Sequence, residues 1–518
     1  MDLLLIKEGF PLLTFLIFLP LAGAVVLLFY HGEAFARLWT LIVTSLTAVF
    51  SLLLISGFNS ASSKYQFAEA YDWIPRFHIN YIVGIDGISI LLVLLTTFIM
   101  PFCVLASWKY IKTRVAPFMF CLLIMETAMI GVFVALDFIL FYIFWEFMLI
   151  PMYLLIAIWG GPRKVYASIK FFLYTLAGSV LLLVAIIALY LKTGSFFIPE
   201  MMWQEYSLTF QVLVFLAFFL AFAIKVPMFP FHTWLPAAHV EAPTAGSVLL
   251  ASILLKMGAY GFLRFCLPLT PDASVYFAPM MIAISVASIL YGGFVALGQK
   301  DMKKLIAYSS VAHMGFVTLG IFIFSLRGFQ GALMVMLNHG ITTGALFMLV
   351  GAIYERSHSR EIANNMGLGK YLPAYMFFFG LFALSSLGFP GTNSFVGELL
   401  VLIGVFKANP WVGAAIIPGV MLGAAYMLRL GQKLAWGEPT CAKAWKDLNL
   451  REWSYLVPLA ILVFYIGLAP GLTLRVLDPS LNRVLDRITP KPKPAIVETA
   501  VLPNTQKGIV AGLFSSSR

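Results

Sequence analysis

The sequence predicts an all-α membrane protein that crosses the bilayer many times. Of its 518 residues, 61% are hydrophobic and only 11% are charged, and the mean hydropathy is +0.94. Soluble domains carry about a quarter charged residues. The apolar stretches also run for about twenty positions, whereas strands of a membrane β-barrel alternate apolar and polar residues. These observations exclude a soluble globule and a barrel.

About fourteen apolar segments are long enough to cross a membrane as helices. The first begins at Phe10 and has no evident signal-peptide cleavage site, so we expect it to remain as the first membrane helix. The predicted spans are residues 10–30, 36–57, 84–108, 117–136, 138–159, 167–191, 208–237, 243–266, 273–297, 303–324, 329–353, 372–406, 410–435 and 454–475.

Lysine and arginine are concentrated in alternate loops. The positive-inside rule places these loops in the cytoplasm and both termini outside. The net charge of +11 therefore indicates membrane orientation, and no basic patch with interleaved aromatic residues points to nucleic acid. The tail after residue 476 is also basic, and we expect its end to be poorly ordered. The lysine- and arginine-rich loops lie around residues 109–114, 163–170, 300–304, 356–370 and 433–451.

The cysteines offer no cofactor site. All four are dispersed and no CxxC pair occurs, which argues against a cysteine-ligated iron–sulfur cluster, a zinc site or a disulfide framework. The chain also lacks a Walker motif and a flavin or dinucleotide fingerprint. We therefore expect it to bind no metal and no redox cofactor. The four residues are Cys103, Cys121, Cys266 and Cys441.

A lysine beside prolines marks the seventh apolar segment, in AIKVPMFPFHTWLP. Lys225 lies at mid-membrane depth, where a charge costs roughly 3 kcal/mol or more. Pro227 and Pro230 follow it and free backbone groups that lipid cannot satisfy. A charge beside a broken helix is typical of an ion-translocating protein.

The twelfth segment, LFALSSLGFPGTNSFVGELL, is broken in the same way. Its break contains Pro390, and Glu398 follows. Two broken segments, one in each half, indicate inverted repeats with ion sites at the breaks. We expect four parts: helices 1–3 in residues 1–116, a first repeat of helices 4–8 in 117–266, a second repeat of helices 9–13 in 273–435, and helix 14 with the tail in 436–518.

Glu146, in YIFWEFMLI, is the expected partner of Lys225. A carboxylate buried alone would take up a proton, so it stays ionised only beside a cation. A pair at about 4 Å gains roughly 4 kcal/mol at an effective dielectric of 20. Separating the two charges would favour loss of the lysine proton, which is a workable proton switch. A purely structural ion pair is the alternative.

Four further residues extend this pair into a polar line. Lys256 lies in mid-segment, His313 and His339 lie in the tenth and eleventh segments, and Glu398 follows the second break. Lysine, histidine and carboxylate groups can pass protons through intervening water. The sequence leaves open the spatial order of the two histidines, and a packing role for each is as plausible as a relay.

Three other titratable residues are candidates for gating or modulating the path. Glu126 lies in the stretch LLIMETAMIGVF, which has no other charged residue, and His232 and His239 follow the break of the seventh segment. A structural, hydrogen-bonded role is the alternative for Glu126. The seven-residue spacing of the histidines fits no helical zinc motif. Asp86 and Asp137 are predicted to be helix caps.

Several motifs together resemble a known family. FYIFWEFMLIPMYLL, AIKVPMFPFHTWLPAAHVEAPTAGSVLLASILLKMGAYGFLRF, AYSSVAHMGFV, LNHGITTGALFMLVGAIYERSHSREI and GFPGTNSFVGE are similar to the antiporter-like membrane subunits of respiratory complex I, NADH:quinone oxidoreductase. Within them, the resemblance is to the group of bacterial subunit M and mitochondrial NADH dehydrogenase subunit 4. It covers residues 80 to 435.

The resemblance implies fourteen membrane helices with two inverted five-helix repeats, and discontinuous helices 7 and 12. It also implies that Glu146 and Lys225 form the family's ion pair, that Lys256 is the central relay lysine and that Glu398 is the exit-side carboxylate. Other antiporter-like subunits commonly carry lysine at the last position. One departure is Ala237, where many relatives have an acidic residue.

The function implied is proton translocation in a bacterial cytoplasmic (inner) membrane, in contact with lipid and with antiporter-like subunits on both sides. FMN, iron–sulfur clusters and quinone are expected on other subunits. Three alternatives remain open from the residues alone. The chain could serve a multisubunit cation/proton antiporter, a membrane-bound hydrogenase or a related ferredoxin-linked complex, or act as a passive scaffold between pumping subunits.

Overall fold

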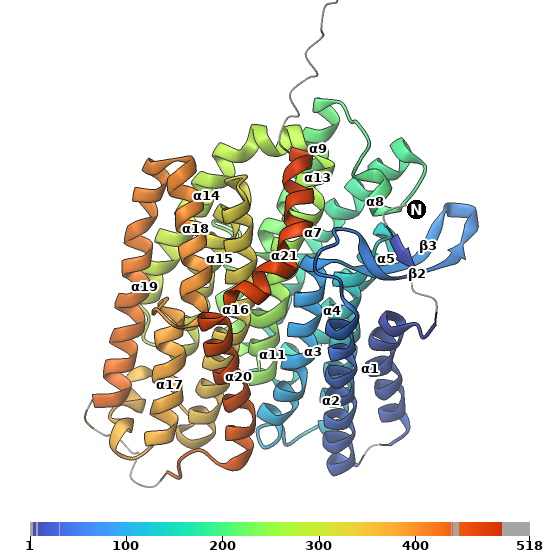
Figure 1. Cartoon of the computed structure of the whole chain (residues 1–518). Helices are drawn as coiled ribbons and strands as arrows, with labels where there is room; N and C mark the ends of the chain where they lie inside the picture. The colour runs from blue at the N-terminus through green and yellow to red at the C-terminus, as the bar shows by residue number, and fades with distance from the viewer. Residues whose placement is uncertain (1–3, 7–8, 31, 437, 439–444, 489–518) are drawn as a thin grey trace, which may run out of the picture.

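Membrane-length helices make up most of the structure (Figure 1). The computed structural model describes residues 4–6, 9–30, 32–436, 438 and 445–488. Within these residues, thirteen helices are long and apolar enough to cross a membrane, or up to fourteen if one bent pair counts as a span. The prediction of an all-α polytopic membrane protein is confirmed. The division into two inverted repeats stays a prediction.

The helices follow the predicted segments closely. The uninterrupted spans are α1 (Leu12–Phe29), α2 (Glu33–Gly57), α3 (Gly87–Ser107), α4 (Val115–Val134), α7 (Lys164–Thr193), α14 (Pro271–Leu297), α15 (Met302–Phe322), α16 (Leu326–Ser357), α19 (Pro410–Trp436) and α20 (Leu450–Leu468). The interrupted spans are α5 (Phe138–Phe147) with α6 (Leu149–Trp159), and the stretch Thr244–Leu269. The span α9 (Leu208–Lys225) ends at a break that precedes the short helix α10 (Trp234–Glu241). The bent pair consists of Ile362–Lys370 and α17 (Pro373–Ser386), and a second break separates α17 from α18 (Asn393–Ala408).

Four spans form the interior of the bundle. The helices α4, α15, α16 and the stretch Thr244–Leu269 are almost entirely buried, whereas α1, α2, α7, α14, α19 and α20 leave more than half of their residues partly or fully exposed. Apolar exposed faces are what lipid or another membrane subunit requires. Polar residues on the four interior spans are therefore shielded from lipid by the outer ring of helices.

The first helix break lies between α9 and α10. Pro227 and Pro230 occupy it, and proline has no N–H to continue a helix. The carbonyl of Ile224, left without a helical partner, accepts a hydrogen bond of 2.8 Å from the Trp234 indole. Such replacement partners are what allow non-helical backbone at membrane depth. Lys225 therefore ends its helix inside the bundle.

The second break separates α17 from α18. Gly388 and Gly391 flank Pro390 with φ angles of +74° and +89°, a backbone region that residues with a Cβ adopt at a cost. Helix resumes at Asn393 and carries Glu398 in its second turn. The glycines and the proline thus account for the turn that positions this carboxylate.

Two elements were not foreseen. The strands β2 (Tyr65–Ile74) and β3 (Ile79–Ile85) form an antiparallel hairpin that projects from the side of the bundle, and β1 (Leu4–Ile6) pairs with β2 (Figure 1). The hairpin was missed because its residues are too polar for a span and too few for a domain. The last predicted span, residues 454–475, is too long at its C-terminal end. Helix α20 ends at Leu468, and a separate helix, α21 (Pro470–Ile488), follows.

Helix α21 is amphipathic, with its buried residues on one side against α3, α13 (Leu267–Leu269) and α16. It is anchored where the Gly87 N–H donates a hydrogen bond of 3.0 Å to the Ser480 hydroxyl. The prediction of a poorly ordered end concerns residues that lie outside the described structure.

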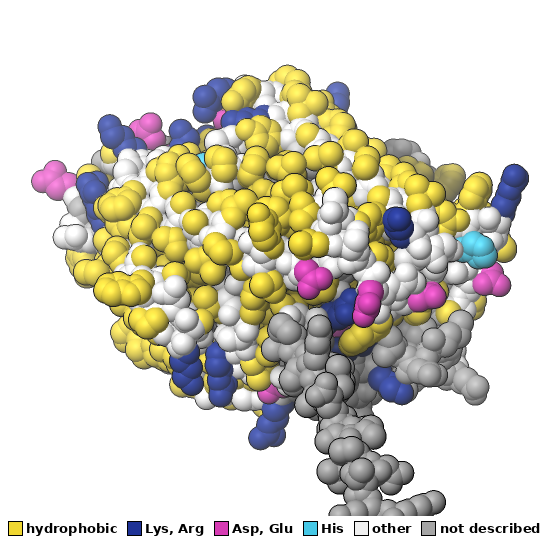
Figure 2. Space-filling view, turned by 90° about the horizontal axis from the view of Figure 1, so that it is seen from above, with side chains coloured by type: hydrophobic (Ala, Val, Ile, Leu, Met, Phe, Trp, Pro, Cys, Tyr) yellow, Lys and Arg dark blue, Asp and Glu magenta, His cyan; other side chains and the backbone are white. Residues whose placement is uncertain are grey.

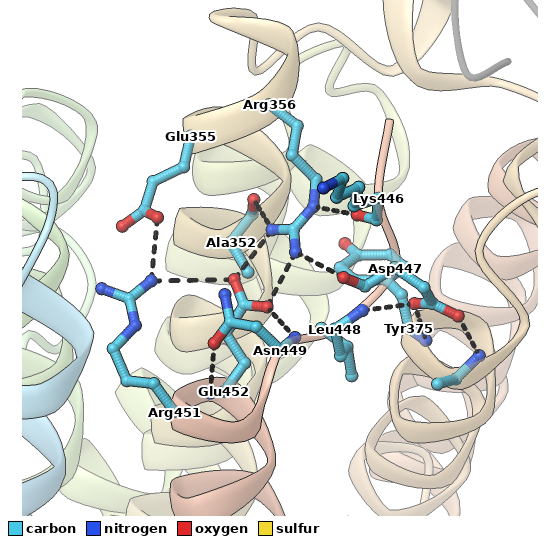
Figure 3. A network of polar contacts seen from close by, with 11 residues as sticks. Ala352, Glu355, Arg356, Tyr375, Lys446, Asp447, Leu448, Asn449, Arg451 and Glu452 are labelled. Carbon is cyan, nitrogen blue, oxygen red and sulfur yellow. Dashed lines mark hydrogen bonds and ion pairs between the residues drawn. The ribbon is translucent and has the colours of Figure 1, made fainter. Parts of the chain in front are cut away.

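The two ends of the bundle differ. Viewed from above (Figure 2), hydrophobic side chains cover much of the surface and charged ones gather toward its edge. The opposite end carries a buried ionic network (Figure 3). There Arg356 of α16 donates two hydrogen bonds, of 2.8 and 2.7 Å, to Glu452 of α20. Asp447 accepts from the first N–H groups of α17. This network holds α17 and α20 to the end of α16.

Candidate proton-relay site

Lys225 is buried at the first helix break. Only 1% of its surface is exposed, and its Nζ has no hydrogen-bond partner in the described structure. Nζ lies 4.8 Å from the centroid of the Trp145 ring. Such a contact is worth about 0.5–2 kcal/mol, less than the cost of burying the charge in a membrane. The ammonium is therefore only partly compensated for its lost hydration.

The predicted ion pair between Glu146 and Lys225 is not formed within the described residues. Glu146 Oε1 lacks a hydrogen-bond partner, as does the lysine. The reason is Trp145, whose ring covers the lysine while its Nε1 donates a hydrogen bond of 2.9 Å to Ser179. The Ser179 hydroxyl also interacts with the Glu146 carboxylate. The two charges still interact electrostatically.

Lys256 lies in the centre of an interior span and contacts a predicted relay histidine. It belongs to α12 (Leu255–Gly261), between two π-helical stretches, a geometry common at functional sites. Its Nζ donates to the Ala251 carbonyl and lies 2.7 Å from Nδ1 of His339. The lysine is fully buried. Because it is an obligate donor when charged, it requires His339 to accept at Nδ1.

His313 joins the same group to the second break. Its Nδ1 lies 3.1 Å from Oε1 of Glu398, and its ring centroid lies 5.7 Å from that of His339. The other ring nitrogen, Nε2, lies 3.5 Å from the Ser386 hydroxyl. The structure thus orders four of the predicted residues as Lys256, His339, His313 and Glu398. This order was open at the level of sequence.

A small cavity connects the two histidines with Glu398. Its volume is about 10 Å³, close to the space that one water molecule needs. Hydroxyl groups make up much of the remaining wall. The lining residues are His313, Val335, His339, Thr342, Thr343, Ser386, Ser394 and Glu398.

No hydrogen bond joins Lys225 to Lys256 in the described structure. Gly258 packs α12 against the end of α9, and a Cβ there would lie 2.9 Å from the Phe222 carbonyl and the Val226 nitrogen. Two ammonium groups cannot hydrogen-bond to each other, because both are donors only. A proton could therefore pass between them only through water or after one lysine has become neutral.

The three candidate modulators all lie buried without hydrogen-bond partners in the described structure. His239 stacks on Phe347 at 4.6 Å and interacts electrostatically with Lys256. His232 lies 4.9 Å from the Tyr291 ring. Glu126 lies on α4, is fully buried and interacts electrostatically with Cys103 of α3. Of the three, His239 is the one that interacts electrostatically with the relay residues Lys256 and His339.

Asp86 and Asp137 cap helices as predicted. Each accepts hydrogen bonds from the first N–H groups of its helix, α3 and α5 respectively. Asp86 also forms a buried bidentate pair with Arg264, which sequence reasoning missed. Burial alone would raise the pKa of Asp86, but the guanidinium outweighs it and lowers the pKa. A signal was available in the sequence, because Asp86 and Arg264 carry opposite charges and lie at the same predicted side of the membrane, each near the end of an apolar segment.

Metal ligation has no support from the arrangement of side chains. In the part of the chain that the structure describes, no three His, Cys, Asp or Glu side chains lie close enough to hold an ion. The predicted absence of cofactors on this chain stays a prediction.

Comparisons with known proteins cover most of the chain. The sequence profile of the family described as "NADH:quinone oxidoreductase/Mrp antiporter, TM" matches residues 135–423, and that of "NADH-ubiquinone oxidoreductase chain 4, amino terminus" matches residues 14–132. The chain is 47% identical to NADH-quinone oxidoreductase subunit M of Rhodobacter capsulatus, over 92% of this chain and 96% of that one. It is 43% identical to NADH-ubiquinone oxidoreductase chain 4 of Chondrus crispus, over 91% and 96%.

Solved structures show the same fold. A chain of respiratory complex I from Thermus thermophilus with bound NADH superposes with a TM-score of 0.86 and 31% identity, over 92% of this chain and all of that one. A chain of the Mrp complex from Dietzia sp. has a TM-score of 0.81 at 20% identity, over 92% and 52%, and shows the fold alone. The chain therefore belongs to the NADH:quinone oxidoreductase/Mrp antiporter family of membrane subunits, in the group of NADH-quinone oxidoreductase subunit M and chain 4.

Proposed function

We propose that this chain translocates protons across a bacterial cytoplasmic membrane, as a membrane-arm subunit of a redox-driven NADH:quinone oxidoreductase. The buried line from Lys256 through His339 and His313 to Glu398 carries the proposal. Hydrogen-bonding titratable groups inside an apolar bundle are costly, and structural needs alone do not require them. The choice of parent complex rests on relatives that are 47% and 43% identical over 92% of this chain and are named NADH-quinone oxidoreductase subunit M.

The path begins at Glu146 and Lys225 and ends at Glu398. Drawing the Glu146 charge away from Lys225 removes the main favourable electrostatic contact of the ammonium, so it gives up its proton. The proton passes through water to Lys256, then through the imidazoles of His339 and His313 to the Glu398 carboxylate, which releases it outward. Each histidine accepts a proton at one ring nitrogen and donates one from the other.

The chemistry that drives this movement belongs to other subunits. Oxidation of NADH and reduction of quinone need FMN and iron–sulfur clusters, and this chain has neither clustered cysteines nor a nucleotide fingerprint. The chain thus acts as a non-redox subunit of a translocating enzyme. Quinone reduction elsewhere would change the electrostatic field along the membrane arm.

Neighbouring subunits are expected to cover the Glu146 face. Glu146 is half-buried on α5, and Ile143, Phe147 and Ile150 beside it are exposed. A carboxylate open to lipid would be strongly disfavoured, whereas a flanking membrane subunit could shield it. We place antiporter-like subunits on both sides, lipid around the remaining faces, and both termini outside.

The test is substitution of Lys225 by alanine in the assembled complex, with Lys407→Ala as a control. Lys407 is an exposed lysine on α18 and lies outside the relay. Proton release and NADH oxidation are measured together in sealed vesicles. We expect fewer protons per NADH in the Lys225 variant alone. Full stoichiometry with normal oxidase activity in that variant would refute the proposal.

A subunit of a cation/proton antiporter or of a membrane-bound hydrogenase is the second candidate. This second candidate is retained because the same fold occurs in a chain of the Mrp complex and in one of an archaeal membrane-bound sulfane sulfur reductase. The two functions differ in their partners. Flavin and iron–sulfur subunits that co-purify with the chain favour the first function, and only small membrane subunits favour an antiporter.

A further inference from the structure

A second, larger cavity lies away from the relay. It occupies about 450 Å³ between α14, α15, α19 and the segment that follows α16. Three basic side chains, Lys300, Arg429 and Lys433, line it together with a single acid, Glu361. All four are exposed, so the cavity is reachable from outside the bundle. It lies at the end that the distribution of lysine and arginine assigns to the cytoplasm.

The three cations of this cavity have no anion of their own. None of Lys300, Arg429 and Lys433 forms an ion pair within the described residues. Nearby arginines at the same end do find carboxylates, since Arg356 pairs with Glu452 and Arg360 with Asp301. With Glu361 as its single acid, the cavity therefore carries a net positive charge, which is the electrostatic character of an anion site.

The depth of the cavity indicates where the anion comes from. Arg429 lies two turns before the end of α19, or about 10 Å inside it at 1.5 Å per residue. Trp436 ends the helix with 82% of its surface exposed, as is typical at a membrane–water interface. Leu428, next to Arg429 on α19, and Phe294, three residues before the end of α14, are 56% and 62% exposed. The basic groups thus stand at headgroup depth beside an apolar outer surface.

From this arrangement we infer that the cavity binds an anionic phospholipid of the predicted cytoplasmic leaflet. Arg429, Lys433 and Lys300 hold the phosphate, and the acyl chains run along Phe294 and Leu428. Basic pockets between membrane helices are suited to such headgroups. A free phosphate ion would satisfy the cations and leave the adjacent apolar surface unused.

The bound lipid would link three helices. Its headgroup contacts α19 and the loop that follows α14, and Leu297 of α14 and Leu305 of α15 form part of the same wall. Helix α15 also carries His313 of the relay. The inference concerns lipid binding by this chain and stands whether or not the chain moves protons.

Lipid retention in the purified parent complex tests the inference. The complex is incorporated into phosphatidylcholine vesicles containing phosphatidylglycerol, re-extracted, and its bound lipids counted by native mass spectrometry. The triple variant Lys300→Gln, Arg429→Gln, Lys433→Gln should bind phosphatidylglycerol at this site on the order of a hundredfold more weakly. The control, Lys109→Gln, Lys112→Gln, Arg114→Gln, removes three exposed charges from the same predicted side and should retain the lipid.

Unchanged retention in the triple variant would overturn the inference. A photoactivatable phosphatidylglycerol added to the unmodified complex gives a second measurement that does not depend on a variant folding. It should label α14, α19 or residues 361–366. Three outcomes would each contradict a lipid headgroup site. They are labelling confined to other helices, burial of these residues against a neighbouring subunit in place of lipid, and displacement of the lipid by millimolar inorganic phosphate.

Discussion

The Nζ atom of Lys256 lies 2.7 Å from Nδ1 of His339, inside two almost entirely buried spans. This contact joins the stretch Thr244–Leu269 to α16 and makes the histidine the immediate acceptor for the lysine. The neighbouring His313 then leads to Glu398 on α18. A chain of titratable groups therefore runs from the interior span Thr244–Leu269 to the second broken region.

Replacing His339 by glutamine should slow proton translocation by at least about tenfold, because an amide cannot take up and pass on a proton. Proton release per NADH oxidised, followed with a pH-sensitive dye in vesicles, is the measurement. His358→Gln is the matched control, since His358 is an exposed histidine at the end of the same helix. Equal pumping by the two variants would contradict a relay through His339.

Replacing Glu398 by glutamine keeps the shape of the side chain and its contact with His313 but removes the group that releases the proton. Pumping should fall strongly while the complex still assembles. Glu200→Gln, at the exposed position of the short helix α8 (Ile198–Met201), controls for loss of a carboxylate in general. If the Glu398 variant pumps as the Glu200 variant does, the exit lies elsewhere.

The two glycines of the second break allow strain to be separated from contact. Both have positive φ, so alanine at either position costs about 1–2 kcal/mol of backbone strain. A Cβ on Gly388 would also lie 2.8 Å from Oε2 of Glu398, whereas one on Gly391 meets nothing within 4 Å. Gly388→Ala should therefore reduce both stability and pumping, and Gly391→Ala stability alone. Thermal unfolding and proton release, measured on both variants, decide this.

Glu452→Gln should destabilise the protein, because it leaves the Arg356 guanidinium without its bidentate partner in a buried site (Figure 3). The expected loss is about 1–3 kcal/mol, seen as a lower unfolding temperature in detergent. Glu355→Gln breaks the more exposed pair with Arg451 and should cost less than about 1 kcal/mol. Equal losses would mean that burial does not decide the strength of the network.

Stability should depend on pH through Asp137, the cap of α5. Burial raises the pKa of this carboxyl to about 6, although hydrogen bonds from the Asn80, Ile139 and Leu140 N–H groups act in the opposite direction. The folded state therefore binds a proton more tightly than the unfolded chain does. Its stabilising contribution is present below about pH 4 and is lost as pH rises toward 6. The change is on the order of 1–3 kcal/mol.

Asp137→Asn removes this titration, so its unfolding temperature should vary less between pH 4 and 6 than that of the parent protein. Asp72→Asn, in the exposed part of the hairpin, is the control and should follow the parent. Parallel curves for all three proteins would show that Asp137 does not titrate in this range.

The membrane spans could be predicted from the sequence because burial in lipid imposes a length and an apolar composition on each one. The breaks at Pro227 and at Pro390 could be located for a related reason, since proline cannot continue a helix hydrogen-bond ladder. Asp86 and Asp137 were recognisable as caps from their positions before apolar runs. Each of these features depends on residues close together in the chain.

Contacts between distant segments could not be obtained in this way. The sequence suggested that Glu146 pairs directly with Lys225, but the Trp145 ring lies against the lysine instead. The buried pair of Asp86 with Arg264 joins residues 178 positions apart. No local pattern specifies such a pairing.

By itself, the sequence determined that this chain crosses a membrane many times and places titratable groups beside two helix breaks, because hydropathy and backbone chemistry act locally. Only the tertiary structure decided that His339 contacts Lys256 and that His313 contacts Glu398. It also decided that α21 folds back along the bundle. Those outcomes depend on how the helices pack, which is a property of surfaces that meet in space.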